Sequence, residues 1–429
     1  MINSSLHIMT SALFTPLRLP NGATLPNRLA KAAMEENMAE EGQLPGAALN
    51  RLYEAWAAGG TGLIITGNVM VDGRAMTGPG GVVLQRDTPL EPFRAWAQSV
   101  TRHGAQVWMQ INHPGRQVPA AMGETTWAPS SVALDLGKHS KMFALPKAMS
   151  EAEIQETIER FADTAHAAEQ AGFNGVEIHA AHGYLLSQFL SPLTNQRKDQ
   201  WGGSIANRSR LLLEVVRAVR RRVSPGFCVA VKLNSADFQR GGFSEGDARD
   251  VVLALNEEAV DLVELSGGSY ESPAMQGRTA DGRTLAREAY FLEFAKELAA
   301  IARMPLMTTG GIRRKSVAEQ VVASGVAVVG VATALAQVPD LSARWRAGED
   351  IAPEPQAISW KDKGMMALAT MAVVKRHLRA LGDGRAHARG DGAPREQRYS
   401  PVFSLITDQL RAQRLTRRYR RWRAEAASR

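Results

Sequence analysis

The sequence predicts an α/β protein that folds as a closed (β/α)8 barrel and carries a helical, Arg-rich C-terminal extension. Eight short apolar runs alternate with helical segments over roughly 310 residues, the pattern of strands joined by crossover helices. The runs are apolar throughout rather than alternating with polar residues, which is typical of parallel strands covered on both faces. No Gly-x-Gly-x-x-Gly motif follows the first run, which disfavours an open, dinucleotide-binding sheet.

The strands are predicted from apolar runs that glycine, proline or asparagine residues punctuate. In chain order the runs are 25–34, which starts with a turn, then 62–67, 106–111, 176–178, 227–233, 260–265, 305–308 and 326–329. The segments with helical spacing are 49–58, 93–103, 151–171, 207–223, 244–257, 285–301 and 316–323, with a final helix within 339–355. The helix from 151 has the clearest start, because Ser150 and Glu153 form an S-x-x-E capping box.

Residues 1–350 are predicted to form the barrel and residues 351–429 the extension. Within the extension we expect a helix at 361–381 and a basic helix at 405–426. From position 375 onward there are 15 Lys and Arg against 5 Asp and Glu, so the net charge of +8 belongs to this tail and the barrel is nearly neutral. We expect a solvated tail that activity does not need, with contact to nucleic acid or an anionic surface as the lesser alternative.

The composition excludes several classes of protein. With a single cysteine, Cys228, the chain cannot form an internal disulfide, a multi-cysteine zinc site or a cysteine-ligated iron–sulfur cluster. No apolar run approaches the roughly 18 residues of a membrane span. Residues 1–10 lack the charged and apolar regions of a signal peptide. We therefore expect a cytoplasmic protein with a large apolar core.

A cluster of hydrogen-bonding side chains follows the fourth strand. The strand at 176–178 ends in a polar loop that contains His179, His182 and Tyr184. In a (β/α)8 barrel, chemistry gathers at the C-terminal ends of the strands, so these three residues are candidate site residues. From the residues alone, the two histidines could be structural, catalytic or metal-binding. No third His, Asp or Glu stands at an obvious ligand position, so we expect no metal.

Residues at other strand ends extend the candidate site. Gln110 can donate and accept hydrogen bonds across a ring edge, and Lys232 can stabilise negative charge that develops on a ring. Gly310-Gly311, after the seventh strand, is typical of a phosphate cradle made of backbone N–H groups. This set fits a phosphate-bearing heteroaromatic ligand. Alternatively, Gln110 and Lys232 line the barrel and are satisfied by neighbours, and we expect Glu177 to be an interior carboxylate rather than a base.

Over residues 13–341 the chain resembles the old yellow enzyme family of FMN-dependent NAD(P)H oxidoreductases. The segment that follows the fourth strand carries the most specific part of this resemblance. The matching motifs are Asn27-Arg28, the strand at 62–67, Gln110, His113-Pro114-Gly115-Arg116, His179, His182, Tyr184, Ser191-Pro192-Leu193, Asn195, Arg197, Asp199, Gly202-Gly203, Asn207-Arg208, Lys232, Ser266-Gly267-Gly268 and Gly310-Gly311. So many motifs in the family's order argue against a chance match.

The resemblance implies that FMN lies across the mouth of the barrel. Ala33 and Met34 would contact the flavin through their backbone, and Gly67 would leave room for its ring. Gln110 would bind the pyrimidine edge, and Lys232 would lie near N1 and C2=O. The phosphate would lie at the ends of the seventh and eighth strands, among Gly310, Gly311, Ala332 and Thr333.

The resemblance also implies the chemistry and the partners. NADPH or NADH would reduce FMN, and His179 and His182 would hold the carbonyl oxygen of an electron-poor alkene while hydride from flavin N5 attacks the β-carbon. Tyr184 would give a proton to the α-carbon, since a phenol is acidic enough to protonate a strongly basic enolate. The partner is then a small-molecule enone, no membrane partner is expected, and a homo-oligomer is left open.

Two positions depart from the family pattern. The arginine that usually holds the phosphate after the eighth strand is replaced, because the matching pair is Ala332-Thr333. Arg313 or Arg314 is a candidate substitute. The flavin-tuning position, commonly threonine or cysteine, is Glu35, whose ionised carboxylate would lower the flavin potential. Alternatively, Glu35 is protonated or turned towards Lys31 or solvent.

Three functions compete. The first is an ene-reductase, or a close variant that reduces quinones or nitro compounds. The second is a flavin barrel of the tRNA dihydrouridine synthase type, which uses a cysteine as proton donor; Cys228, within the fifth strand, is poorly placed for that role. The third is a non-catalytic barrel that has lost its cofactor, a reading motivated by Thr333.

Overall fold

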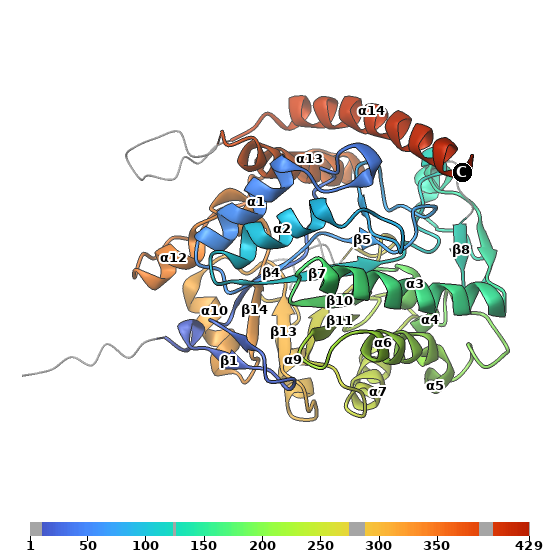
Figure 1. Ribbon diagram of the computed structural model, residues 1–429, viewed down its shortest axis with the longest axis horizontal. Coiled ribbons are helices and arrows are strands. Elements are labelled where there is room, and N and C mark those ends of the chain that lie inside the picture. Colours follow the sequence, from blue (N-terminus) through green and yellow to red (C-terminus); the bar gives the residue numbers. More distant parts are fainter. Residues whose placement is uncertain (1–10, 123–125, 274–287, 386–397, 429) are drawn as a thin grey trace, which may run out of the picture.

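The computed structural model describes residues 11–122, 126–273, 288–385 and 398–428. Its centre is a closed barrel of parallel strands surrounded by helices, which confirms the predicted fold (Figure 1). The barrel strands are β3 (Leu29–Lys31), β4 (Leu63–Ile65), β7 (Gln106–Asn112), β10 (Gly175–Ala180), β11 (Cys228–Asn234), β12 (Leu262–Ser266), β13 (Leu306–Thr309) and β14 (Val328–Val331). The ring closes because β14 pairs with β3, and β10 pairs with both β7 and β11.

Short strands that the sequence pattern did not predict lie outside the barrel. They are the β1 (Leu17–Arg18) and β2 (Thr24–Leu25) hairpin, β5 (Val69–Met70) and β6 (Val82–Val83) beside β7, and the parallel pair β8 (Thr126–Ala128) and β9 (Pro146–Ala148). Two or three residues are too few to establish a periodicity, so these strands carry no clear sequence signal.

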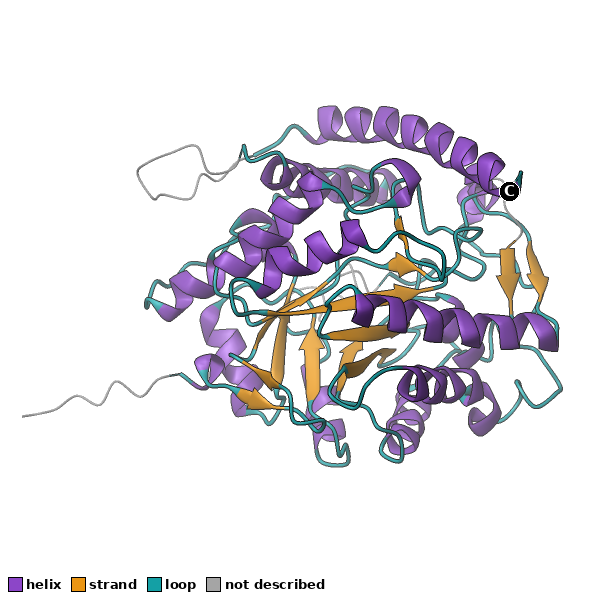
Figure 2. Cartoon of the chain, in the orientation of Figure 1, coloured by secondary structure: helices purple, strands orange, loops and turns teal. Residues whose placement is uncertain are grey.

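Helices cover the outside of the barrel (Figure 2). They are α1 (Ala47–Ala58), α2 (Glu91–Thr101), α3 (Glu151–Gln170), α4 (Leu185–Leu190), α5 (Ile205–Arg208), α6 (Arg210–Arg222), α7 (Glu245–Leu255), α9 (Leu292–Ala299), α10 (Lys315–Ala323), α11 (Thr333–Gln337) and α12 (Leu341–Arg346). The capping box that starts α3 is confirmed: Ser150 N donates to Glu153 Oε2 over 2.8 Å, and Glu153 N donates to Ser150 Oγ over 3.3 Å. The expected helix at 207–223 is divided at Ser209 into α5 and α6.

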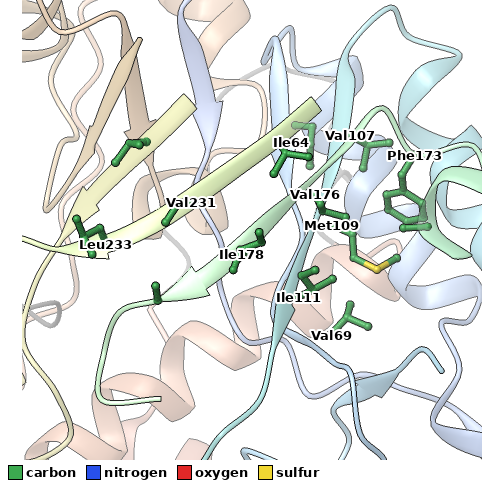
Figure 3. Packing of buried hydrophobic residues seen from close by; sticks show 14 of the residues in the cluster. Ile64, Val69, Val107, Met109, Ile111, Phe173, Val176, Ile178, Val231 and Leu233 are labelled. Carbon is green, nitrogen blue, oxygen red and sulfur yellow. The ribbon is translucent and has the colours of Figure 1, made fainter. Parts of the chain in front are cut away.

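Each barrel strand has one face toward the helices and one toward the barrel axis. Figure 3 shows the outer face, where Val107, Met109 and Ile111 of β7 lie near Val176 and Ile178 of β10. A separate apolar cluster fills the interior of the barrel towards the N-terminal ends of the strands. Its barrel-strand members are Ala30, Leu63, Ile65, Trp108, Cys228, Ala230, Leu262, Met307 and Val328. Because both faces are apolar here, the strands read as continuous apolar runs.

The C-terminal extension forms two long helices, α13 (Lys363–Gly382) and α14 (Pro401–Ala427). The first packs against α1, and the second lies along the first at the edge of the molecule (Figure 1). The far end of α14 reaches the short helices η2 (Glu41–Gln43) and η3 (Ala120–Met122). Both follow barrel strands, so α14 lies against loops at the C-terminal side of the barrel.

The basic helix α14 differs from the solvated tail that its charge suggested. Tyr419 is fully buried, and its hydroxyl donates to the carbonyl of Gly73 over 3.0 Å. The Trp422 ring covers the same glycine, where a Cβ would lie 2.6 Å from the ring. Arg418 and Arg420 donate to backbone carbonyls of the loops after β3 and β7. A few buried residues among many arginines therefore dock this helix.

No helix in the described ranges is long and apolar enough to span a bilayer.

Candidate active site

The sequence-predicted site residues come together at the C-terminal ends of the barrel strands, as the fold requires. Their positions are Ala33, Met34 and Glu35 after β3, Gly67 after β4, Gln110 in β7, His179 in β10 with His182 and Tyr184 in the loop that follows, Lys232 in β11, Gly310 and Gly311 after β13, and Ala332 and Thr333 after β14. Neighbouring strands place Gln110 beside Glu177 and His179 beside Lys232 in register.

His179, His182 and Tyr184 form one cluster. The His179 ring lies edge-on to the other two rings, with centroid distances of 5.0 Å to His182 and 4.8 Å to Tyr184. His182 Nε2 lies 2.8 Å from the Ser266 hydroxyl. His179 and Tyr184 are almost completely buried, so their polar atoms act in a largely dry environment. No group of three His, Cys, Asp or Glu side chains gathers for a metal in the described part of the chain.

The loop that carries these rings is held in an unusual backbone conformation. His182 has a φ of 61°, in the left-handed region that residues other than glycine rarely adopt. Its N–H donates to Asn234 Oδ1 over 3.1 Å, and its carbonyl accepts from Gln117 Nε2 over 3.1 Å. Gln188 Nε2 donates to the carbonyl of Gly183 over 2.7 Å. Contacts from three parts of the chain therefore hold the strained histidine, as is common at functional sites.

Burial keeps both imidazoles neutral. It lowers the pKa of His179 well below its ordinary value, and the neighbouring His182 and Lys232 lower it further. The pKa of His182 is also lowered by burial and by Lys232. His179 Nδ1 accepts a hydrogen bond from Ala181 N over 3.2 Å. A neutral His179 therefore carries its proton on Nε2, the nitrogen left to donate to a ligand.

The Tyr184 hydroxyl lies among groups that the sequence analysis did not single out. It is 3.1 Å from the hydroxyl of Tyr270, and it accepts a hydrogen bond from Asn68. Burial raises the pKa of Tyr184 well above its ordinary value, and the nearby Tyr270 and Glu35 raise it further. The phenol therefore keeps its proton at neutral pH. Asn68 stands at a predicted strand end, whereas Tyr270 is 86 positions from Tyr184 and no local pattern connects them.

Glu35 does not contact Lys31, one of the partners considered for it. Its carboxylate accepts a 2.6 Å hydrogen bond from Thr77 Oγ1 and faces the two tyrosines. Lys31 instead lies 3.5 Å from Glu36 and donates to the carbonyl of Ile65 over 2.8 Å. Burial lowers the pKa of Lys31 to about 8, although the charge of Glu36 opposes this shift.

The backbone at Gly67 is fixed from α1. Its N–H donates to the Tyr53 hydroxyl over 2.8 Å, and that hydroxyl donates to Glu36. A Cβ at Gly67 would lie 2.0 Å from Glu36 Oε2 and 2.4 Å from the carbonyl oxygen of Met34. Only glycine allows this close approach of two strand-end loops.

Gln110 and Lys232 are paired with carboxyl groups inside the barrel. Gln110 Nε2 donates to Glu177 Oε2 over 2.6 Å, and Lys232 Nζ lies 2.6 Å from Glu264 Oε1. Thr309 Oγ1 donates to the same Glu264 oxygen over 2.6 Å. The alternative that neighbours satisfy these two residues therefore holds in this structure, and Glu177 is the interior carboxylate that the sequence predicts. Sequence reasoning missed Glu264.

The glycine pair after β13 is in close contact with the segment before α9. A Cβ at Gly311 would lie 2.5 Å from the Tyr290 hydroxyl. Glu288 Oε2 accepts from the backbone N–H groups of Arg313 and Arg314, each over 3.2 Å. Its other oxygen lies 2.7 Å from Arg314 Nε and 3.2 Å from Arg313 Nε. The candidate arginines thus hold an anionic group, here a carboxylate of the chain itself.

These residues fit FMN, although the two ends of the site differ. At the ring end, Gly67 provides the close backbone approach and Gln110 and Lys232 the hydrogen-bond donors that a flavin ring requires. At the other end, the N–H and guanidinium groups around Glu288 form the donor set that a phosphate requires. Ala332 and Thr333 lie at the end of β14 and the start of α11, beside this set in the barrel order.

Comparisons with known proteins identify the family. Residues 12–350 match the model of the NADH:flavin oxidoreductase / NADH oxidase family. The chain is 37% identical over 346 residues to the NADH-dependent flavin oxidoreductase iliE of Hypocrea jecorina (strain QM6a), covering 76% of this chain and 86% of that protein. It is 38% identical over 345 residues to the protein of the same name from Neonectria sp. (strain DH2), covering 74% of this chain but only 44% of that longer relative.

Solved structures give the same result. The old yellow enzyme homologue from Zymomonas mobilis superposes with a TM-score of 0.69 at 25% identity, covering 80% of this chain and 95% of that one. Morphinone reductase in complex with tetrahydroNAD superposes with a TM-score of 0.67 at 25% identity, covering 80% and 93%. The chain therefore belongs to the NADH:flavin oxidoreductase / NADH oxidase family and shares the barrel of the old yellow enzymes.

Proposed function

We propose that this flavin oxidoreductase takes hydride from NADPH or NADH and reduces the C=C bond of an α,β-unsaturated carbonyl compound, or a related acceptor such as a quinone or nitro compound. The observation that carries the proposal is the cluster at one strand end in which the His179 ring contacts both the His182 ring and the Tyr184 phenol. Relatives named as NADH-dependent flavin oxidoreductases and morphinone reductase support it.

The chain's own residues would hold FMN along the barrel mouth. Gln110 would bind the pyrimidine edge, and the Lys232 ammonium would lie where reduced flavin is negative. The backbone of Ala33 and Met34, with Glu35 and Gly67, would border the ring. The phosphate would bind Gly310, Gly311, Ala332 and Thr333, helped by Arg313 and Arg314. Bound FMN supplies the exchange of hydride between the nicotinamide and the substrate.

The two imidazoles would activate the substrate as neutral donors. His179 presents Nε2–H, and His182 can turn its Nε2–H from Ser266 to the carbonyl oxygen of the substrate. Hydrogen bonds to this oxygen stabilise the negative charge that develops there as hydride reaches the β-carbon. Because burial keeps the imidazoles uncharged, they polarise the carbonyl without donating a full proton to it.

Tyr184 would then protonate the α-carbon. Its raised pKa keeps the phenol protonated until the enolate, a stronger base, forms beside it. The Tyr270 hydroxyl and the Asn68 amide can donate hydrogen bonds to the phenolate that remains. The negative charge of Glu35 favours return of a proton to that phenolate.

The test separates the two half-reactions in the full-length protein. We expect yellow protein that loses its colour with NADPH or NADH and regains it with an enone. Tyr184→Phe should leave the first step intact and slow the second by roughly 100-fold or more, the usual size of general acid catalysis. Tyr399→Phe, in the extension, is the matched control. Colourless protein that FMN cannot reconstitute contradicts the proposed function, and an unchanged second step contradicts the role of Tyr184.

The dihydrouridine synthase alternative is weakened by Cys228. This residue starts β11, at the end of the barrel opposite the site, and burial raises the pKa of its thiol to about 12. A thiol there cannot serve as the proton donor.

Three further expectations stay predictions. They are the division into a barrel at 1–350 and an extension at 351–429, a homo-oligomer, and a cytoplasmic location.

A further inference from the structure

A carboxyl pair lies inside the barrel below the expected position of the flavin ring. Glu177 and Glu264 are both fully buried, and their carboxyl groups lie close enough for each to perturb the pKa of the other. Among the described residues, no donor reaches Glu177 Oε1 or Glu264 Oε2, whereas Gln110 Nε2 donates to the other oxygen of Glu177 and Lys232 Nζ to the other oxygen of Glu264. Lys232 pairs with Glu264, and Glu177 has only the neutral Gln110 as a hydrogen-bond donor, so an ionised Glu177 would be a second buried negative charge beside the first and the group instead holds a proton.

The strand register explains why these groups meet. Lys232 of β11 is paired directly with Glu264 of β12, and Gln110 of β7 directly with Glu177 of β10. All four side chains point towards the barrel axis, above the apolar cluster. Gly330 of β14 completes the layer, because a Cβ there would lie 1.9 Å from Thr309 Oγ1, which donates to Glu264.

The positive and negative charges of this layer of side chains cancel. Burial and the adjacent charge of Glu264 raise the pKa of Glu177 well above its ordinary value, so Glu177 is the carboxyl group that is protonated. Burial also acts to raise the pKa of Glu264, but Lys232 and the hydrogen bonds lower it overall. One ammonium, one carboxylate and one neutral carboxyl group therefore leave the layer with no net charge.

Few other ionisable groups act on the pair. From β10, His179 lies above it and is neutral, as is His182 in the following loop. From β3, Lys31 interacts with Glu177 across the barrel, and its own charge is paired with Glu36. Gln110 of β7 and Thr309 of β13 do not titrate. Lys232 is thus the dominant charge that Glu264 faces.

We propose that Glu264, together with Glu177, takes up a proton from solvent when the bound flavin is reduced. This inference rests on the proposed function, since it requires FMN beside Lys232. Hydride from NADH brings two electrons and one proton, so the flavin gains one negative charge while the nicotinamide leaves as NAD⁺. A second proton on the carboxyl pair neutralises Glu264 and frees Lys232 to face the reduced ring. Charge in the site is then the same before and after reduction.

The experiment counts protons. The FMN-loaded, full-length protein is reduced anaerobically by one equivalent of NADH in weakly buffered solution at pH 8 containing phenol red. Hydride transfer alone consumes no proton from solvent, whereas the carboxyl pair would consume about one per flavin. The loss of flavin absorbance reports reduction separately, so a protein that cannot be reduced contradicts the proposed function, and one that is reduced without proton uptake contradicts this inference.

Variants locate the proton. Glu264→Gln should abolish the uptake and raise the flavin midpoint potential, because it removes a negative charge near the ring. Glu264→Asp should keep the uptake, and Glu293→Gln, on the exposed side of α9, should change neither quantity. Uptake that persists in Glu264→Gln places the proton on the flavin and overturns the inference. If Glu264→Gln does not hold FMN, the absorbance spectrum of the reduced wild-type flavin decides: uptake with an anionic reduced flavin supports the inference, whereas a neutral reduced flavin has taken the proton itself and overturns it.

Discussion

The two ends of the proposed flavin site are built in different ways. The ring end is formed by strand ends and backbone: His179 and Lys232 sit on neighbouring barrel strands, and Gly67 is fixed by a hydrogen bond from α1. The phosphate end is closed by side chains of one segment, in which Glu288 and Tyr290 contact the glycine pair and the arginines that follow it. The ring end is therefore preformed, whereas in the proposed site FMN would displace Glu288 from the other end.

This difference separates catalytic geometry from cofactor retention. Strand ends in a closed barrel cannot move independently, so the ring end keeps its shape whether or not a phosphate is bound. A carboxylate at the phosphate end meanwhile accepts the hydrogen bonds of these donors, so they are paired without a phosphate. Changes at the ring end should therefore be severe, and changes at the phosphate end should tune affinity.

The largest expected effect is at Gly67. In Gly67→Ala the methyl group would meet a backbone carbonyl 2.4 Å away, which cannot move like a side chain. We expect FMN binding to weaken by about tenfold to 100-fold, in line with the roughly 1–3 kcal/mol of overpacking. Equilibrium dialysis measures it. Gly226→Ala, where nothing lies within 4 Å of the added methyl, is the control. Equal affinity in both variants would mean that the ring end is not preformed.

The phosphate end should respond in the opposite direction. Glu288→Gln removes the charged competitor for the N–H groups of Arg313 and Arg314, so FMN should bind about tenfold more tightly. Riboflavin, which lacks the phosphate, should bind equally to both proteins. The control Glu354→Gln removes a carboxylate that pairs with the Arg313 guanidinium but accepts no hydrogen bond from the backbone N–H groups of Arg313 and Arg314. It should have little effect on the affinity for FMN. A gain that riboflavin shares would disprove competition with the phosphate.

A smaller effect is expected at Tyr270. Tyr270→Phe removes one hydrogen-bond donor, worth about 1 kcal/mol, from the Tyr184 phenolate. Stopped-flow measurements should show reoxidation by an enone slowed by about threefold to tenfold, with reduction by NADH unchanged. Slowing of both steps to the same extent would point to a distorted site rather than a lost donor.

The smallest effect is an expected absence of change. His179 and His182 have pKa values well below 6.5, so neither titrates between pH 7 and pH 9, and the KM for an enone should be constant there. Below about pH 6.5 the unfolded chain binds protons that the folded histidines do not. The free energy of unfolding should therefore decrease as the pH is lowered below this value. Urea denaturation at several pH values checks this. A KM that follows a pKa near 6.5 would show that one imidazole is exposed and charged.

The sequence was sufficient for the barrel and for residues at strand ends, because both depend on local apolar runs and the residues that follow them. Gln110, His179 and Lys232 were found in this way. Partners brought by other segments were not predictable: Tyr270 lies in a loop without periodicity, and Glu288 lies within the segment 285–301 that was predicted to be helical, whereas α9 begins only at Leu292. Glu264 lies within a predicted strand, but its side was not assigned, since an apolar run does not reveal which residues face the axis.

The docking of the C-terminal extension also could not be predicted from local sequence patterns. The charge of the last residues predicted a solvated helix, and charge is the correct guide for most of its surface. The docking of α14 depends on Leu415, Tyr419 and Trp422, three residues among many arginines. Their partners are glycine positions more than 300 residues earlier, which no local pattern identifies.

The packing of α14 also limits how this enzyme can be engineered. One helix contacts the loops that follow β3, β5 and β7, through Arg418, Tyr419 and Arg420 respectively. Substitutions in these loops are therefore energetically coupled through a shared partner and need not add independently. Loop grafts or directed evolution at the barrel mouth should vary the three loops together with the helix, as one mutational unit.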